Sequence, residues 1–212
     1  KWSEGNTMSI LVIAEHDNKI LKGTTLNTVA AATKISDEIS LLIAGSDMDS
    51  VIDEAQKIDS VNSILKCDND IYKNALAEDL AALVLSNAGS FTHILAPAST
   101  FGKNLMPRIS AKLDTQQISD IISVESDNTF KRPIYAGSCI ATVKSNDSTK
   151  VITVRSTAFD SVECNNSGIE ISEIDALETS GISKFISEEI AQSDRPELTA
   201  ADIVISGGRG MR

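Results

Sequence analysis

The first half of the chain alternates short apolar runs with segments in which apolar residues recur every three or four positions. The run "SILVIAE" (9–15) is continuous and rich in Val and Ile, which is typical of a strand buried on both faces of a sheet. Three further runs have the same character: "EISLLIAG", "VNSILKC" and "THILAPA". A helical pattern follows each run, so the sequence predicts four consecutive βα units.

The helical patterns place apolar residues on one face. The expected helical positions are Leu26, Val29, Ala30 and Thr33 in the first; Val51, Ile52, Ala55 and Ile58 in the second; Leu76, Leu80, Leu83 and Val84 of 72–87 in the third; and 102–113 in the fourth. Consecutive βα units form a parallel sheet with right-handed crossovers and helices on both faces. The expected fold class is α/β, a Rossmann-like three-layer α/β/α structure, with "ISDIISVES" as a fifth parallel strand.

The pattern changes after this strand. The runs "TFKRPIYAG", "SCIATVKS" and "TKVITVRSTAF" are strand-like and have no helices between them. The cluster "SNDS" (145–148) suits a hairpin turn. We therefore expect an antiparallel addition to the sheet edge in the C-terminal part of the fold, with Pro133 at an edge or entry position because proline cannot donate to a ladder.

Polar residues dominate 163–194, and we expect a mobile loop there, with a short helix at "ISKFISEEIAQ" (182–192). The stretch "SDRPELT" (193–199) combines charge with proline, which is typical of a domain boundary. The following "ADIVISGG" (201–208) predicts a strand that opens a second domain.

Composition excludes several classes of protein. The formal net charge of -11 argues against nucleic-acid binding, which depends on Lys and Arg neutralising phosphates. The hydrophobic fraction of 42% is typical of a soluble globular chain. No apolar run approaches the roughly 18 residues of a membrane span, so we expect no membrane insertion.

The cysteines predict neither a disulfide framework nor a zinc site. Cys67, Cys139 and Cys164 are odd in number and widely spaced, and only His16 and His93 are available as companions. This usage fits a reducing compartment. His93 directly precedes an apolar strand and is expected to be a structural histidine.

Two loops at the expected carboxyl edge of the sheet are candidate sites. In the loop 15–21, His16 beside Asp17 can form an acid/base pair, but no nucleophile motif accompanies them, and a polar loop is the favoured interpretation. The second loop offers Ser99, Thr100, Gly102 and Lys103 ahead of a helix.

The second loop has two interpretations. Its hydroxyls, backbone N–H groups and cation can bind a phosphate at a helix N-terminus. It lacks the GxxxxGK[ST] spacing of a P-loop. Helix capping, together with packing against another chain, is therefore favoured.

The end of the sequence, "SGGRG" (206–210), carries a stronger signal. Its glycines follow a predicted strand and let a backbone approach a ligand closely. Arg209 offers a planar fork for bidentate phosphate binding. A glycine-rich tail without a ligand is the alternative.

Several motifs together resemble the α subunit of electron transfer flavoprotein, from position 9 to position 212. They are "ILVIAEH", "TFGKNLMPRISAKL", "ISDII", "IYAGSCIATVK", "TVRSTAFD" and "SDRPELTAADIVISGGRG". The combination of "DRPELT" with "SGGRG" is the most specific, and the match is poorest across 163–189.

The resemblance implies a role in a heterodimeric electron carrier rather than an enzyme. Such an α subunit has a Rossmann-like N-terminal domain and a C-terminal FAD domain, and it pairs with a β subunit that carries AMP. The carrier accepts electrons from acyl-CoA and other dehydrogenases, as in fatty acid β-oxidation, and passes them to a quinone oxidoreductase. By the same resemblance, Arg209 and the adjacent Gly208 contact FAD.

The expected organisation follows from this resemblance. Residues 8–195 form the N-terminal domain, and 196–212 form a linker with the first strand and loop of a truncated FAD domain, so we expect FAD to be absent from this chain. Its own role is then mainly structural and subunit-binding, through 129–159 and the loop 100–104, which we expect to contact the β subunit or the FAD domain. Met8 is the expected natural start.

The main alternative is a stand-alone adenine-nucleotide-binding module that uses the loops 15–21 and 97–104. The expected location is a bacterial cytoplasm, or the mitochondrial matrix if the source is a eukaryote.

Overall fold

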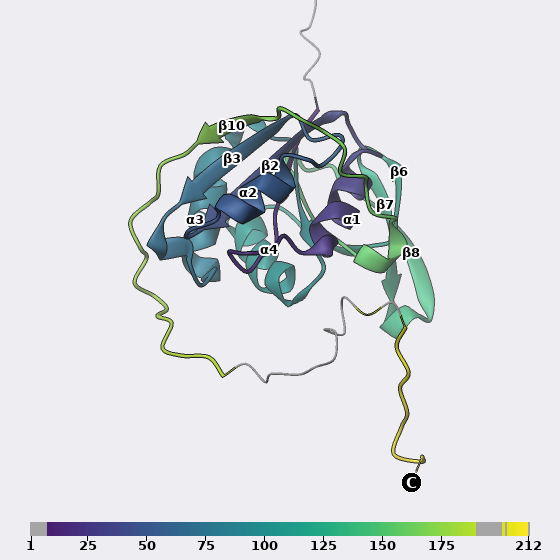
Figure 1. Ribbon diagram of the computed structural model, residues 1–212. Helices are drawn as coiled ribbons and strands as arrows, with labels where there is room; N and C mark the ends of the chain where they lie inside the picture. Colours follow the sequence, from purple (N-terminus) through teal and green to yellow (C-terminus); the bar gives the residue numbers. More distant parts are fainter. Residues whose placement is uncertain (1–7, 190–200, 202, 212) are drawn as a thin grey trace, which may run out of the picture.

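A parallel sheet of seven strands forms the centre of the computed structural model, which describes residues 8–189, 201 and 203–211 (Figure 1). In spatial order the strands are β10 (Glu170–Glu173), β3 (Ser63–Asp68), β2 (Glu38–Gly45), β1 (Ser9–Ile13), β4 (His93–Pro97), β9 (Lys150–Val154) and β5 (Ile118–Ile121). Every neighbouring pair is parallel. The predicted succession of βα units is thus confirmed.

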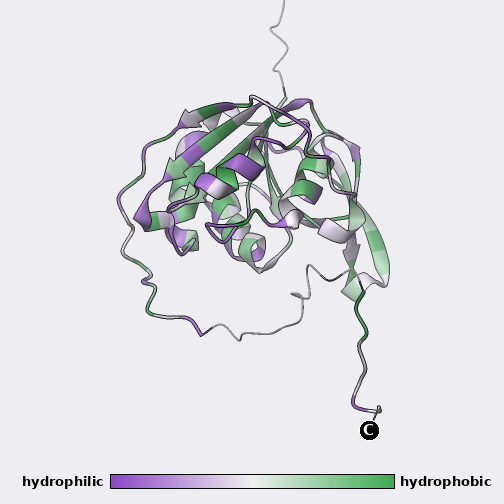
Figure 2. Ribbon diagram, viewed as in Figure 1, coloured by the Kyte–Doolittle hydropathy of each residue, from purple (hydrophilic) through white to green (hydrophobic). Residues whose placement is uncertain are grey.

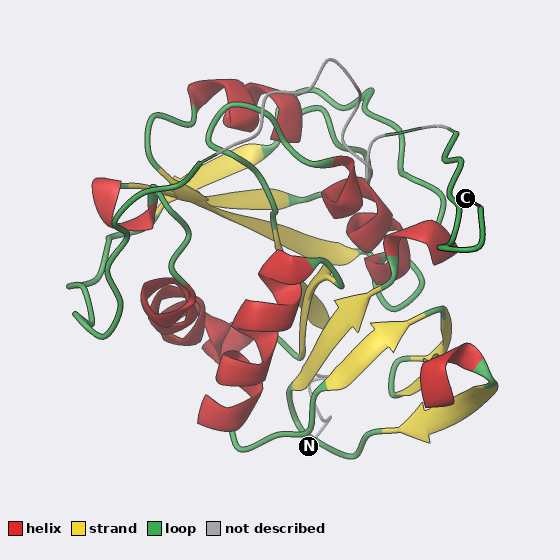
Figure 3. Ribbon diagram, turned by 90° about the horizontal axis from the view of Figure 1, so that it is seen from below, coloured by secondary structure: helices red, strands yellow, loops and turns green. Residues whose placement is uncertain are grey.

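Helices cover both faces of this sheet, as Figure 3 shows. They are α1 (Gly23–Ala32), α2 (Asp49–Ala55), α3 (Ala77–Asn87) and α4 (Thr100–Lys112). Buried residues of α1 and α2 belong to one core cluster, and those of α3 and α4 belong to the other. The structure is therefore the predicted three-layer α/β/α fold. No helix in the described residues is long and apolar enough to cross a membrane.

Successive side chains of β1 point to opposite faces of the sheet, so this strand contributes to both core clusters. Ile10 and Val12 pack into the cluster of α1 and α2, whereas Leu11 and Ile13 pack into the cluster of α3 and α4. Each of the four is at most 1% exposed, and burying one such side chain stabilises a fold by about 1.5–3 kcal/mol. Figure 2 shows the resulting concentration of hydrophobic residues along the central strands.

The buried face of α1 differs from the predicted one. Of the four predicted positions only Val29 is buried, and the buried face includes Thr25 and Thr28. The Thr28 hydroxyl donates to the carbonyl oxygen of Thr24 over 2.8 Å, and the Thr25 hydroxyl accepts from the N–H of Glu15 over 3.0 Å. Because local backbone groups satisfy these hydroxyls, the helix can turn a partly polar face toward the sheet.

A small antiparallel sheet stands beside the main one. It is made of β6 (Ser123–Ser126), β7 (Thr129–Ile134) and β8 (Cys139–Lys144), with β7 in the centre. Phe130 is fully buried in the cluster of α1 and α2 and anchors this sheet to the body. An antiparallel addition was predicted here, but its hairpin was misplaced: the turn is the short helix η3 (Tyr135–Gly137), not 145–148, which lead into β9.

The prediction that 149–159 belong to the antiparallel addition is wrong. β9 lies inside the main sheet, parallel to both β4 and β5. Val151, Ile152 and Val154 are all buried, which is the continuous apolar pattern of a strand covered on both faces. The local edge position of Pro133 is confirmed, because the pairing of β7 with β6 stops at Lys131 and Pro133 pairs only with β8.

The predicted loop at 163–194 contains a strand. β10 pairs in parallel with β3 and extends the sheet at its far edge. The predicted helix at 182–192 is wrong for 182–189, which are not helical, and its last three residues lie outside the described part. The exposed side chains of Ile182 and Ile186 have no surface to pack on, and a short helix without packing is unstable in water.

The strand predicted at 201–208 is also absent where the structure describes it, at 201 and 203–208. These residues extend away from the body, and Ile203 and Ile205 are exposed (Figure 1). A strand needs a neighbour to receive its backbone hydrogen bonds, and this segment has none in the described chain.

The segment after β10 is fixed by two buried polar groups, Asp79 of α3 and Tyr72, which precedes α3. Asp79, which is 4% exposed, accepts hydrogen bonds from the Thr179 hydroxyl at 3.1 Å and the Ser180 N–H at 2.7 Å. Tyr72 accepts from the N–H of Leu177 at 3.1 Å. Burial alone would raise the pKa of Asp79, but hydrogen bonds from Ser180 and Thr179 outweigh it and lower the pKa below its ordinary value of 3.8.

We predict that Asp79→Asn loosens residues 177–181 by about 1–3 kcal/mol, because it replaces hydrogen bonds to a charged acceptor. Hydrogen exchange at the Ser180 amide should rise, whereas Glu178→Gln, on an exposed neighbour in the same segment, should leave it unchanged. The native pKa is depressed, so the stabilisation is present above pH 3.8 and is lost as the pH falls through the native value. Equal exchange in both variants would contradict the assignment.

Candidate functional site

A hollow of about 340 Å³ opens at the carboxyl edge of the main sheet. It lies beside the position where β1 and β4 are neighbours and the strand order changes direction, which is where open α/β sheets bind ligands. The residues that line it come from α1, the loop between β4 and α4, α4 itself, β5 and the turn after β9: Thr24, Ala98, Ser99, Lys103, Asp120, Arg155, Ser156 and Thr157.

The N-terminus of α4 forms one wall of the hollow because a glycine lets it approach β4. A Cβ on Gly102 would lie 1.9 Å from the carbonyl oxygen of Pro97, so only glycine fits without a shift of the backbone. Ser99 caps the helix, its hydroxyl accepting from the Gly102 N–H at 3.5 Å. The predicted capping role of this loop is confirmed. Its predicted packing against another chain stays a prediction.

The opposite wall contains an ion pair between β5 and the end of β9. The Arg155 guanidinium donates to both carboxylate oxygens of Asp120, from Nε at 3.1 Å and from Nη2. Asp120 has a φ of 59°, and its N–H donates to the Thr153 hydroxyl at 2.8 Å. These hydrogen bonds from Arg155 to Asp120 raise the pKa of the guanidinium further above its ordinary value. The pair fixes the edge of the sheet and the direction of the Arg155 side chain.

The charges that line the hollow leave one positive charge in excess. Lys103 and Arg155 are cationic, and Asp120 is the one carboxylate among the lining residues. Ser156 and Thr157 add hydroxyl groups, and the first turn of α4 adds backbone N–H groups. The lining contains neither His nor Cys. The arrangement therefore suits contact with an anionic group.

His16 and Asp17 do not form an acid/base pair. Asp17 accepts from the backbone N–H groups of Lys19 and Ile20, at 3.0 and 2.8 Å, and pairs with Lys22 at 3.0 Å. Burial lowers the pKa of His16, although a hydrogen bond to the Ala44 backbone and the charge of Asp17 oppose it. The structure supports the polar loop that was the favoured interpretation.

His93 is structural, as predicted. It is 1% exposed, and its two ring nitrogens lie 2.8 Å from the Thr92 hydroxyl and 2.7 Å from the carbonyl oxygen of Asp127. Burial lowers its pKa. The described residues contain no group of three His, Cys, Asp or Glu side chains that could hold a metal.

The cysteines are unreactive or isolated. Burial, with the charges of Asp68 and Asp175, raises the pKa of Cys67 to about 11. Cys139 and Cys164 are exposed and free. A thiolate at neutral pH is therefore not favoured at Cys67.

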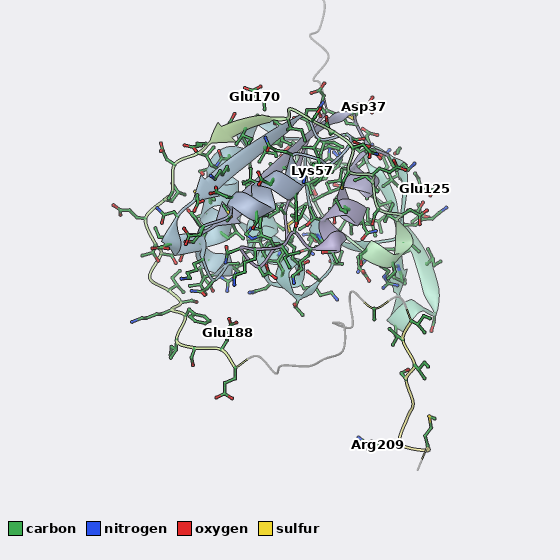
Figure 4. The ribbon with its side chains drawn as sticks, viewed as in Figure 1. Asp37, Lys57, Glu125, Glu170, Glu188 and Arg209 are labelled. Atoms are coloured by element: carbon green, nitrogen blue, oxygen red, sulfur yellow. The ribbon has the colours of Figure 1, made fainter. Side chains whose placement is uncertain are left out.

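The predicted flavin contacts Arg209 and Gly208 lie far from the hollow. Both are exposed in the segment 203–211, and Figure 4 shows Arg209 at the distant end of that segment. The Met211 N–H donates to the carbonyl oxygen of Gly208 at 3.1 Å, which closes a turn around Arg209. The structure brings neither residue close to the loops at the sheet edge, and their role with FAD stays a prediction.

Sequence reasoning identified Ser99 and Lys103 but missed Asp120 and Arg155. These two residues are 35 positions apart, and only the three-dimensional adjacency of β5 and β9 brings them together. The available signal was that Arg155 directly follows the apolar run 151–154, whereas Asp120 lies inside "ISDII" and carried no such signal. That signal required β9 to be recognised as a parallel strand.

Comparison with known proteins gives a consistent result along most of the chain. The sequence model of the family described as electron transfer flavoprotein domain matches residues 10–179. The chain is 50% identical over 205 residues to the electron transfer flavoprotein subunit alpha of Pseudomonas aeruginosa, covering 97% of this chain and 66% of that protein. It is 43% identical over 218 residues to the mitochondrial electron transfer flavoprotein subunit alpha of Dictyostelium discoideum, covering 95% and 61%.

A third relative is the electron transfer flavoprotein subunit alpha of Bradyrhizobium diazoefficiens, 45% identical over 205 residues, with 97% and 65% covered. The chain thus spans 61 to 66% of the length of these relatives.

We predict that Gly102→Ala destabilises the fold by about 1–3 kcal/mol, because the added methyl group meets a backbone carbonyl that cannot move aside. The matched control is Gly23→Ala, also in a helix, where nothing lies within 4 Å of the added Cβ. This control should be stabilised by about 0.5–1 kcal/mol. Urea unfolding measures both, and a Gly102→Ala variant as stable as the control would show that α4 does not depend on this close approach.

Proposed function

The chain belongs to the electron transfer flavoprotein family, and we propose that it is the N-terminal part of an α subunit of such a flavoprotein. The observation that carries the proposal is 50% identity over 97% of the chain to a protein named electron transfer flavoprotein subunit alpha. The family match over residues 10–179 also supports a carrier subunit rather than a catalyst.

We propose two parts: residues 8–195 as the Rossmann-like N-terminal domain, and 196–212 as a linker with the first segment of a FAD-binding domain. The family match over 10–179 falls within the first part and supports this division. The extended course of 203–211, away from the sheet, is consistent with a segment outside the first domain. In this arrangement the first part is the structural and subunit-binding unit.

FAD is the cofactor that this proposal implies for the whole protein, where it supplies the redox chemistry. The residues described here do not enclose such a group: Arg209 and Gly208 are exposed and line no part of the hollow. Our proposal for this chain is limited to contact between FAD and these two residues, through the guanidinium fork and the close approach that glycine permits.

The proposed partner is a β subunit, which would carry AMP. The whole carrier would accept electrons from acyl-CoA and other dehydrogenases and pass them to a quinone oxidoreductase. Relatives named as bacterial and as mitochondrial support a bacterial cytoplasm or a mitochondrial matrix as the location.

The hairpin of β7 and β8 is the proposed contact surface for the partner or for the FAD domain, together with the loop 100–104. β8 is an edge strand with one side unpaired, and exposed strand edges are sites of association. Most of β8 is exposed, including Cys139 and Ile140. A lone domain would leave this apolar edge in water.

A second candidate function is a stand-alone adenine-nucleotide-binding module. The hollow beside Ser99 and Lys103 favours it, since an anion can bind there. The loop 15–21 does not line the hollow, and its Asp17 carboxylate pairs with Lys22, so only one of the two predicted loops contributes. Titration with AMP, followed by amide shifts at Ser99 and Lys103, separates this candidate from the carrier.

We predict that the purified 212-residue chain is colourless, because its described residues offer no enclosed flavin site. Visible absorbance after gel filtration measures retained flavin. The complete α polypeptide of the same source, purified with its β subunit, is the control and should be yellow. Stoichiometric flavin in the 212-residue chain would contradict the division into two parts.

We also predict that, when the complete α polypeptide is co-expressed with the β subunit, amides of residues 134–144 are protected from hydrogen exchange beyond their protection in this chain, whereas β9, already inside the main sheet, is unchanged. The reason is that a partner covers the open edge of β8. New protection confined to α1, α2 or α3 would place the contact on another face.

A further inference from the structure

The hairpin 129–144 is basic in a chain of net charge -11. It carries Lys131, Arg132 and Lys144, and it contains no Asp or Glu. Lys131 pairs with Glu125 of β6 at 3.1 Å, and Figure 4 shows Glu125 beside this sheet. The local charge therefore favours an acidic partner surface.

The buried Nε–H group of Arg132 has no hydrogen-bond acceptor among the described residues. This Nε is one of two side-chain nitrogen or oxygen atoms in the described residues that are buried without a hydrogen bond; the other is the Thr115 hydroxyl. A buried donor without a partner is costly, and a guanidinium retains its charge at all physiological pH values. An acceptor outside the described chain explains why such a group is placed here.

The register of β7 places Arg132 at the border between the core and the exposed hairpin. Side chains alternate along a strand, so Arg132 shares a face with Phe130 and Ile134 and lies opposite Ala141 of β8. Phe130 is fully buried, whereas Ile134 is half-buried. Arg132 thus lies where this face passes from the core to the exposed part of the hairpin.

The turn next to Arg132 is apolar, exposed and strained. Tyr135 is 80% exposed, and Ile140 is 61% exposed. Tyr135 and Ala136 have φ values of 50° and 53°, a left-handed conformation that non-glycine residues rarely adopt. Strain of this kind is concentrated at functional and binding sites. An exposed Tyr beside an unpaired Arg has the composition of an interface centre.

We propose that Arg132 receives a carboxylate from the partner subunit and determines how that subunit is oriented on the hairpin. This inference rests on the proposed heterodimer and adds the chemistry of its contact: an acidic side chain flanked by apolar residues that pack on Tyr135 and Ile140. The planar fork of Arg binds a carboxylate through two hydrogen bonds, which fixes direction as well as contact.

Two carboxylates on the neighbouring strands β5 and β6 are already engaged. Glu125 pairs with Lys131, and Asp120 pairs with Arg155. A second copy of this chain is disfavoured as the occupant, because a twofold contact through the hairpins would bring two basic surfaces together. An acidic partner of different sequence fits the charge.

The test compares Arg132→Met with Lys131→Met in the complete heterodimer. We expect Arg132→Met to raise the dissociation constant for the β subunit about 30-fold or more, the range for truncation of one partner in a buried charge pair. Lys131→Met should change it less than about threefold, since its pair with Glu125 lies within the chain and is partly exposed. Biolayer interferometry measures both.

A second readout separates binding from folding. In the isolated 212-residue chain, Arg132→Met should leave the Tm unchanged or raise it, because the change removes a buried donor that lacks an acceptor. A lowered Tm with weakened binding would overturn the proposal in favour of a structural role. The variant Arg132→Glu should lose binding. Replacing the one Asp or Glu of the β subunit that accepts from Arg132 with Lys should restore binding to this variant and so identify the acceptor.

Three other results would also overturn the proposal. Equal dissociation constants for the two Met variants would show that Arg132 makes no contact. A homodimer of the isolated chain, in sedimentation, that Arg132→Met dissolves would make a second copy the occupant. If the unaltered complete α polypeptide binds no β subunit, the proposed function is wrong as well. If it binds and only the effect of Arg132→Met is missing, the proposal for Arg132 alone is wrong.

Discussion

Burial of the central strands on both faces is the constraint on which the rest of the molecule depends. β1 lies between β2 and β4, and its residues Ile10, Leu11 and Val12 are completely inaccessible to solvent. Parallel neighbours require crossover connections, and the crossover helices cover both faces of the sheet. Polar groups can then gather freely only at the ends of the strands, because on the buried faces each needs a hydrogen-bond partner. The hollow lined by Lys103 and Arg155 lies at the carboxyl edge for this reason.

The small antiparallel sheet shows what happens where that covering ends. The chain leaves the main sheet after Ile121, next to Asp120, whose left-handed φ coincides with the irregular pairing of β5 with β9. The side chain of Phe130 packs into the core, whereas most of β8 is exposed to solvent. A hairpin held by a single buried aromatic residue has little surface of its own to bury. Its exposed edge is consequently available to another polypeptide.

The sequence predicted the first four βα units because their apolar runs are long, rich in Val and Ile, and separated by clear helical patterns. β9 was assigned wrongly because it follows two antiparallel strands, although its buried run Val151, Ile152 and Val154 has the pattern of a central strand. β10 could not be predicted from "EISE", since its place depends on backbone pairing with β3 rather than on apolar side chains. The ion pair of Arg155 with Asp120 was out of reach because it depends on the neighbouring positions of β5 and β9.

The distribution of charge separates two kinds of arginine in this chain. Arg155 is matched within the domain, since Asp120 meets its guanidinium through two hydrogen bonds. Arg132 has a buried Nε without an acceptor, and Arg209 is exposed far from the body. A guanidinium that is hydrogen-bonded to a carboxylate of its own domain stabilises that domain. A guanidinium without such a partner can still donate hydrogen bonds to another molecule. We therefore place the proposed contacts of this chain at Arg132 for a protein carboxylate and at Arg209 for a cofactor, and assign Arg155 to the stability of the domain itself.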